Sequence, residues 1–395
     1  MEIGSGNQSI FRDQYEALFC RQWPVVTAAL LVAVTNVFLF AFERPWTASD
    51  GTRNWGDWLF RGLGVIEGAG LIAPWLFSGS ILNLGLLGGA CAAALLSREF
   101  AIRVAPAGEL VKGSVGGLLM GAGAVLAFGC NIGGFFSALS ALSLSGLAMM
   151  LGLGIGAYIG LRYLLWEVDH WPKLSMGRSW TWCAPRAAAM GVQPLLGGLL
   201  LAALLALPFA YNTFGYTPQG GFLLFGVAFG VVFQRSRFCL VRAFREPFMT
   251  GEADHTRAAA LALVVSVLGF SILKFTDLKD ATTWVFPGFW LGGLVGGTLF
   301  GVGMVLAGGC GAGSIWRAGE GHVKLWVAIL GFSISGSLAR EAMIRWQLRE
   351  RMGTAVFLPN VTGWAPALWL VLAVLAAWYL FAAWNEKSGK LSLTS

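Results

Sequence analysis

The stretch GGLLMGAGAVLAFGC, residues 116–130, returns 180 positions later as GGTLFGVGMVLAGGC, residues 296–310. Ten of the fifteen aligned residues are identical, without a gap, and both copies end in a cysteine. Similarity of this kind at a fixed offset is the sequence signature of an internal repeat. It predicts a chain built from two related halves, each with a glycine-rich run that stops at a cysteine.

The composition places these repeats in a membrane. Hydrophobic residues make up 56% of the 395 residues and charged residues 12%, about half of the share usual in soluble proteins. The 18 tryptophans and 28 phenylalanines suit aromatic belts at membrane interfaces. The formal charge of +7 comes from residues in short connections, so it indicates topology and no nucleic-acid partner. We expect an all-α, polytopic protein in the lipid bilayer.

Apolar runs predict where the helices lie. They cover 24–42, 59–78, 80–97, 113–128, 144–165, 195–211, 220–234, 258–275, 288–307, 323–339 and 364–384. Some are short: the run 113–128 reaches roughly 24 Å at 1.5 Å per residue, against a hydrocarbon core of about 30 Å. Short runs interrupted by glycine are typical of re-entrant or broken helices around a central path.

The domain organisation follows from these runs. We expect a single transmembrane domain over 1–395, internal repeats at about 80–166 and 220–340, and flanking helices at 24–42 and 364–384. If the run 258–275 crosses the membrane, the two Gly-Cys bends enter from opposite faces and meet near its middle.

Basic residues predict the orientation of the chain in the membrane. They concentrate in the connections 98–112, 166–194 and 235–257. Two spans separate successive basic connections, so all three can lie in the cytoplasm.

The cysteines differ in context. No pair has metal-ligand spacing and none adjoins a histidine, so a zinc site is not expected. Cys91 is interpreted as a small packing residue. Cys130 and Cys310 each close a glycine-rich run before a polar bend, in GCNIGG and GCGAGS. Glycines let the backbone unwind there, and a helix that restarts offers its positive end to an anion. A thiol at that point suits a sulfur-containing ligand.

The neighbours of the two bends complete the candidate path: Gly129, Asn131, Gly309, Gly311 and Ser314. Cys239 lies in QRSRFCLVRAFRE among arginines, a field that attracts anions and lowers a thiol pKa. A basic membrane-edge connection that only sets topology explains these arginines equally well, but not the cysteine. Arg235, Arg237 and Arg317 are the predicted anion-attracting residues, with Arg317 at the mouth of the path. No catalytic constellation is found, so no enzyme activity, metal or cofactor is expected.

Three motifs resemble the YeeE/YedE family of membrane proteins: QRSRFC (234–239), GGCGAGSIWRAGEG (308–321) and GCNIGGFFSALSALSLSG (129–146). The resemblance covers most of the chain, and its length is similar to the YedE branch linked with selenium metabolism. It implies uptake of thiosulfate across a bacterial-type inner membrane, with Cys239, Cys310 and Cys130 passing the ion along through transient S–H···S contacts. It also implies a cytosolic TusA-like sulfur-carrier partner. By pseudo-symmetry we expect Ala101 at the position of the first half that corresponds to Cys239. The path would then contain three sulfur atoms instead of four.

Two classes of function remain open. The first is a transporter for a small inorganic anion containing sulfur or selenium, thiosulfate-like, whose weak binding to neutral thiols allows release. A selenium-compound transporter serving selenium metabolism is a variant of it. The second is a membrane sulfurtransferase, in which a thiolate such as Cys239 holds the outer sulfur as a persulfide. The lack of an obvious general base favours the transporter.

Overall fold

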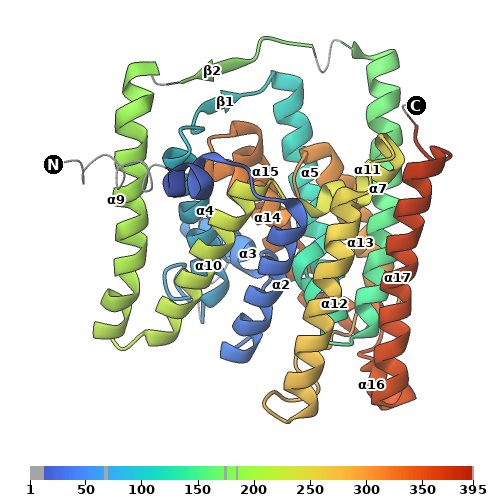
Figure 1. Ribbon diagram of the computed structural model, residues 1–395. Coiled ribbons are helices and arrows are strands. Elements are labelled where there is room, and N and C mark those ends of the chain that lie inside the picture. Colours follow the sequence, from blue (N-terminus) through green and yellow to red (C-terminus); the bar gives the residue numbers. More distant parts are fainter. Residues whose placement is uncertain (1–12, 66–69, 173–175, 184–185, 394–395) are drawn as a thin grey trace.

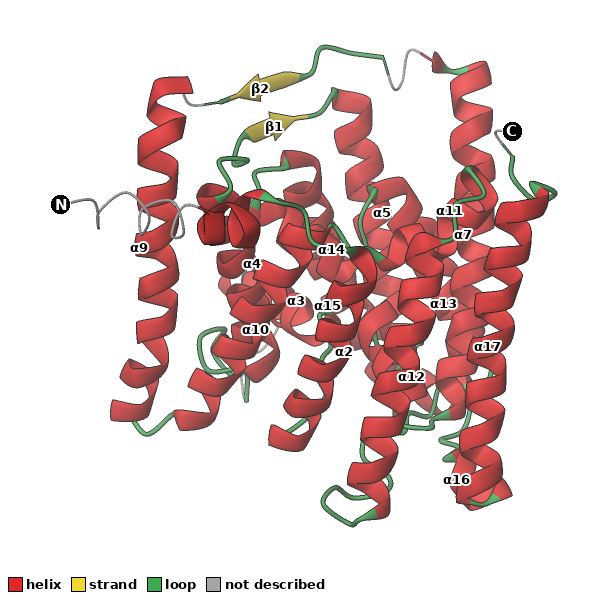
Figure 2. Ribbon diagram, viewed as in Figure 1, coloured by secondary structure: helices red, strands yellow, loops and turns green. Residues whose placement is uncertain are grey.

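The computed structural model describes residues 13–65, 70–172, 176–183 and 186–393. Within these ranges ten helical segments are long and apolar enough to span a membrane, and two three-residue strands are the extended elements. Figure 2 shows a bundle of helices with the two strands at one end. The prediction of an all-α, polytopic membrane protein is confirmed.

The described elements fall into two sets joined by a connection. The first set is η1 (Glu16–Cys20), α2 (Val25–Phe42), α3 (Ser49–Gly62), α4 (Ser78–Leu96), β1 (Ile102–Val104), α5 (Ala107–Leu126), η2 (Asn131–Ser137), α6 (Ala138–Ser140) and α7 (Leu144–His170). The connection holds β2 (Trp180–Trp182) and α9 (Arg186–Thr213). The second set is α10 (Thr217–Ser236), α11 (Leu240–Met249), α12 (Asp254–Phe275), α13 (Leu291–Ala307), α14 (Gly311–Gly319), α15 (Val323–Arg345), η3 (Leu348–Met352), α16 (Leu358–Thr362) and α17 (Trp364–Ser388).

The helix contacts between the two sets come in equivalent pairs. Helix α4 packs along α10 as α12 packs along α2, and α5 packs along α15 as α13 packs along α7. Helix α3 contacts α4 and α15, and α11 makes the matching contacts with α12 and α7. We propose that the repeats run over Val25–His170 and Thr217–Arg345. This assignment puts α2 inside the first repeat, where the sequence had suggested a flanking helix.

The crossing of α5 and α13 lies on the pseudo-two-fold axis. A Cβ added to Gly116 would lie 2.6 Å from Ala307 N and from Gly303 O. A Cβ added to Gly296 would lie 2.6 Å from Ala127 N and from Gly123 O. Each contact is the other shifted by 180 positions. The repeated glycines therefore exist because two backbones touch here, which only glycine allows.

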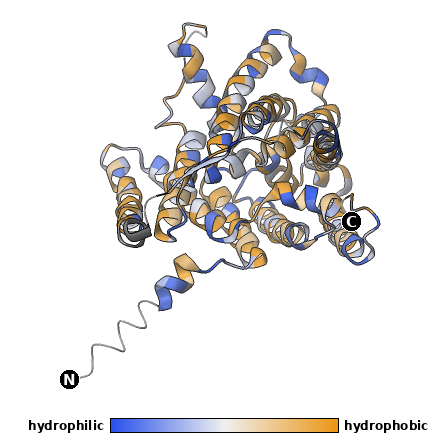
Figure 3. Ribbon diagram, turned by 90° about the horizontal axis from the view of Figure 1, so that it is seen from above, coloured by the Kyte–Doolittle hydropathy of each residue, from blue (hydrophilic) through white to orange (hydrophobic). Residues whose placement is uncertain are grey.

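Helix α9 makes the second repeat inverted. Helix α7 ends and α9 begins on the face that carries β1 and β2, here called the strand face, and α9 then crosses to the opposite face, where α10 begins (Figure 1). One extra crossing reverses the direction of every later helix. Leu199 and Phe209 on α9 are 60% and 76% exposed, as lipid contact requires. Figure 3 shows hydrophobic residues along most of the helices.

Helix α5 starts earlier than its apolar run predicts. It covers 20 residues from Ala107, about 30 Å, so the expectation that 113–128 marks a short helix is wrong. Charged residues in its first turns are paired: Lys112 contacts Glu167 at 2.7 Å and Lys324 contacts Glu109 at 2.6 Å. The charges lower the local hydropathy of the first turns of α5, and the residues that pair with them are far away in the sequence. A hydropathy pattern therefore does not predict these turns.

The run 59–78 does not form one spanning helix. Helix α3 ends at Gly62 and α4 begins at Ser78, while residues 66–69 lie outside the described part of the chain. Helix α3 instead begins at Ser49, in a polar stretch that enters the protein after α2 has crossed. The prediction of a helix over 59–78 is therefore wrong: of the described residues in this run, only the last turn of α3 and the first residue of α4 are helical.

Candidate functional site

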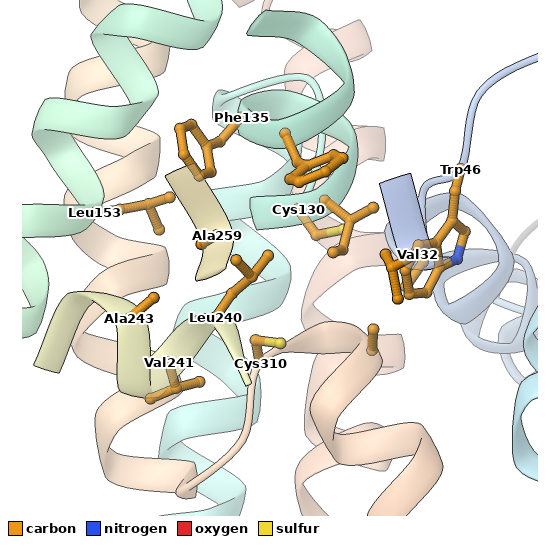
Figure 4. Close-up of a cluster of buried hydrophobic side chains, with 14 of the residues drawn as sticks. Val32, Trp46, Cys130, Phe135, Leu153, Leu240, Val241, Ala243, Ala259 and Cys310 are labelled. Carbon is orange, nitrogen blue, oxygen red and sulfur yellow. The ribbon is translucent and has the colours of Figure 1, made fainter. Parts of the chain in front are cut away.

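Four short helices begin close together at the centre of the molecule. The residues at their N-terminal cap positions are Ala48 for α3, Cys130 for η2, Cys239 for α11 and Cys310 for α14. A Cβ added to Gly311 would lie 3.6 Å from Cβ of Cys130 and 3.7 Å from Cβ of Ala48. The Cys310 thiol lies within electrostatic reach of Cys130 and Cys239. Figure 4 shows Cys130 and Cys310 in this cluster, which side chains from several helices fill.

The same local geometry produces both Gly-Cys bends. Phe128 and Gly308, 180 positions apart, have φ values of 59° and 77°, in the left-handed region that reverses a helix end. Each cysteine then adopts an extended conformation, and its carbonyl accepts the first bond of the next helix. Gly134 N donates to Cys130 O, and Ser314 N donates to Cys310 O, both at 2.7 Å. The structure thus brings the two bends together, as their repetition had led us to expect.

Unpartnered polar groups surround Cys310. Gly313 N donates to Cys310 Sγ at 3.3 Å, and the thiol is 3% exposed. The amide of Asn131 lies beside this thiol, but neither amide atom makes a hydrogen bond of good geometry within the described chain. Ser314 Oγ, four residues after Cys310, is also buried without a hydrogen-bond partner in the described chain, as is Trp316 Nε1 further along α14. Because such groups are costly in a folded protein, they indicate where a polar ligand binds.

Cys130 contacts two hydroxyl groups. Its Sγ lies 3.7 Å from Thr47 Oγ1, and its backbone N–H donates to Ser49 Oγ at 3.2 Å. Thr47 and Ser49 are themselves 3.0 Å apart. Both flank Ala48 at the start of α3 and line a cavity that opens on the opposite face.

This cavity, here called the vestibule, has a volume of about 710 Å³. Thr47, Ser49 and Gly129 lie at its buried end. Apolar side chains such as Phe128 and Phe332 form much of the remaining lining, together with three arginines: Arg53 from α3, Arg340 from α15 and Arg349 from η3. Arg53 and Arg340 lie 3.6 Å and 3.7 Å from the same carboxylate oxygen of Asp57. Its acidic lining residues are Asp50 and Glu350, and Asp50 pairs with Arg44 at 2.6 Å. The side chains that line the vestibule thus carry three positive and two negative charges, an excess that favours anions.

Cys239 lies on the side of the cluster nearer the strand face and is partly exposed. Arg317 lies within electrostatic reach of Cys239 and donates to Gly308 O at 2.8 Å. Arg237 pairs with Glu320 at 2.7 Å and with Glu99 at 3.1 Å. Burial raises the pKa of Glu320, in the turn after α14, and Arg237 opposes that shift.

The predicted site residues thus divide into two groups. The bends bring Gly129, Cys130, Asn131, Gly309, Cys310, Gly311 and Ser314 to the centre, with Cys239 beside them. Arg235 is 2% exposed and is held by Glu99 at 3.2 Å and by Arg21 O at 2.9 Å. Arg235 and Arg237 are therefore both held by acidic partners, whereas Arg317 lies within electrostatic reach of Cys239.

The residue matching Cys239 in the first repeat is Ala48, and the assignment to Ala101 was wrong. Cys239 and Ala48 stand at the same cap position of α11 and α3, and each carbonyl accepts a bond from the residue four positions later, at 3.2 Å. Ala101 instead lies beyond α4, next to β1. The two segments share too few residues for an alignment to find the match.

Sequence reasoning missed the hydroxyls and the vestibule. Thr47 and Ser49 lie in a polar connection with no counterpart of similar type in the second repeat. The arginines at 340–351 were visible in the sequence, but their position across from Arg53 depends on the packing of α15 against α3.

The chain is similar in sequence to known membrane transporters. A family model described as sulphur transport matches residues 6–159 and 235–394. The probable transporter YedE of Escherichia coli is 29% identical over 333 residues, which is 80% of each chain. The thiosulfate transporter TsuA of Escherichia coli is 36% identical over 119 residues, 30% of this chain and 33% of that protein. TsuA of Spirochaeta thermophila is 28% identical over 180 residues, 42% of this chain and 54% of that protein.

The matched ranges contain Cys130, Cys239 and Cys310, together with the short helices that these residues cap. They leave out the end of α7, all of α9 and most of α10. Because the family model covers most of both repeats, the chain belongs to the sulphur transport family, the YeeE/YedE family that its motifs resemble.

Proposed function

We propose that the protein transports a small inorganic anion containing sulfur, with thiosulfate as the first candidate, from the vestibule past Cys130, Cys310 and Cys239 to the strand face. The observation that supports this most directly is the pair of unpartnered buried side chains next to the bends, Asn131 and Ser314, close to a cavity that three arginines help to line. The thiosulfate transporters among its relatives suggest the substrate class. Selenium analogues have similar charge and size and belong to the same class.

Three physical effects move the anion in this proposal. Arg53, Arg340 and Arg349 raise its concentration in the vestibule. The N-termini of the short helices then offer positive potential where water is excluded. Neutral thiols interact with the ion weakly at several positions in turn, which permits both binding and release. Arg237 and Arg317 receive it near Cys239.

We further propose that the strand face is cytoplasmic and that the membrane is a bacterial inner membrane. The basic connections 98–112, 166–194 and 235–257 all adjoin helix ends on this face, in agreement with the positive-inside rule. A small sulfur-carrier protein of the TusA type would then receive the ion near Cys239, where the path reaches the cytoplasm.

Uptake into proteoliposomes tests the proposed function. We expect purified protein to accumulate labelled thiosulfate well above protein-free vesicles, and unlabelled sulfate to compete poorly. Mass spectrometry of the same samples separates transport from sulfurtransferase chemistry. A persulfide trapped on Cys239 during turnover, without net uptake, would establish the transferase in place of the transporter.

Neutralising the vestibule should weaken capture of the anion without affecting the fold. We expect Arg340→Gln with Arg349→Gln to raise KM for thiosulfate roughly three- to tenfold at low salt, and less at high salt because exposed charges are screened. The measurement is initial uptake rate against substrate concentration at two ionic strengths. Arg351→Gln is the matched control, since Arg351 is exposed in the same turn but does not line the cavity. An equal effect of the control, or no salt dependence, would contradict capture by these two side chains.

A further inference from the structure

We propose that Thr47 and Ser49 form a hydroxyl site that holds the oxygen end of the anion while Cys130 contacts its sulfur end. The site then selects anions that have both an oxyanion end and a soft sulfur or selenium end. This inference rests on the proposed function and narrows its substrate class. Sulfate lacks the soft end and hydrosulfide lacks the oxygen end.

The pseudo-symmetry locates the site. At the cap of α11 the second repeat places a thiol, Cys239, whereas at the cap of α3 the first repeat places the methyl group of Ala48. The residues on either side of Ala48 carry hydroxyls, and both line the vestibule. The cap of α3, at the vestibule end of the path, is therefore flanked by hydroxyl donors. The equivalent cap of α11, at the other end, carries a thiol.

Hydrogen counting shows that the hydroxyl site has a donor to spare. Thr47, Ser49 and Cys130 carry three polar side-chain hydrogens. Two contacts join these groups, Thr47 Oγ1 to Ser49 Oγ at 3.0 Å and Thr47 Oγ1 to Cys130 Sγ at 3.7 Å. Within the described chain, no further bond is donated by these three side chains. At least one hydrogen is thus free for an acceptor in the vestibule.

Packing fixes the position of the donors. Thr47 is 4% exposed, and a Cβ added to Gly133 would lie 2.6 Å from its Cβ. The Cys130 N–H holds Ser49 Oγ at 3.2 Å. A fixed pair of hydroxyls next to a thiol discriminates by type of ligand atom, because hydroxyl hydrogens bind charged oxygens strongly while the thiol is a soft, weak partner.

The test compares the kinetic effects of hydroxyl removal on different anions. Thr47→Val keeps the side-chain shape and removes the hydroxyl, and Ser49→Ala is the second variant. We expect KM for labelled thiosulfate to rise about ten- to a hundredfold, the range expected from loss of a hydrogen bond to a charged group. Inhibition of uptake by sulfite should weaken in parallel, whereas inhibition by hydrosulfide should stay within about twofold, because hydrosulfide makes no use of the hydroxyls.

Controls separate this role from a structural one. Thr47→Ser, which keeps the hydroxyl, should restore wild-type discrimination. Thr35→Val is the matched control, since Thr35 is a helix residue that bonds its own helix at Leu31 O. Equal weakening of sulfite and hydrosulfide inhibition in both hydroxyl variants would overturn the inference, as would unchanged KM. Absence of thiosulfate uptake by the wild-type protein would instead overturn the proposed function.

Discussion

We expect replacement of Cys310 by serine to lower thiosulfate uptake about 100-fold, the loss expected when a buried side chain no longer fits a charged ligand. Cys310 lies within electrostatic reach of both other cysteines and is almost fully buried. Serine fits the volume and can accept the Gly313 N–H, as an N-cap residue ordinarily does. The variant therefore keeps the fold, and what it removes is the soft sulfur atom.

The matched control for this prediction is Cys91→Ser. Cys91 lines a separate apolar cavity of about 570 Å³ with Leu200 and Trp326, away from the bends, so its replacement should leave uptake within about twofold. Cys130→Ser and Cys239→Ser should lose uptake as Cys310→Ser does. Initial rates in proteoliposomes at matched protein density give the comparison. If each of the three variants kept more than half of the wild-type rate, the thiols would not carry the ion.

Substitution of either repeated glycine at the α5–α13 crossing destabilises the protein strongly and equally. A Cβ on Gly116 or on Gly296 would lie 2.6 Å from backbone atoms of the partner helix, and backbone cannot move aside as a side chain can. We expect Gly116→Ala and Gly296→Ala each to cost about 3 kcal/mol, at the upper end for overpacking. Thermal unfolding in detergent measures both, and the two losses should agree within about 1 kcal/mol because the contacts are symmetric.

Gly154→Ala on α7 is the control for the crossing. A Cβ there meets nothing within 4 Å, so the change should be neutral or stabilising by about 0.5–1 kcal/mol, as for alanine in an open helix position. A large loss at Gly116 with none at Gly296 would show that the two halves do not pack as equivalent units.

The parts of the fold that could be predicted from the sequence are those where a close contact allows only one type of residue. Backbone approach requires glycine in both copies of the α5–α13 segment, so the repeat was visible there, and the cysteines at Cys130 and Cys310 closed it. Helices α2 and α3 have the same packing as α10 and α11, but lipid-facing and packing positions accept many apolar residues. The equivalence of these helices is therefore visible in the structure but not in the amino-acid sequence.

Charge and hydroxyl chemistry were harder to predict for a related reason. Lys112 and Glu109 looked like connection residues because each is polar, and only folding brings Glu167 and Lys324 beside them. Thr47 gave no signal by itself, since a threonine near a helix start is common. Its importance depends on the distance to Cys130, which no local pattern encodes.

The reciprocal contacts at the α5–α13 crossing carry a consequence for ancestry. At this crossing, equivalent residues of the two halves make the same contact in both directions. Reciprocal contacts of this kind are typical of an isologous homodimer interface. The crossing is the interface that two antiparallel copies of a half-length ancestor would form in a membrane. Because each repeat here begins and ends on one face of the membrane, two copies in opposite orientation share one chain only when a further crossing joins them, and α9 supplies that crossing.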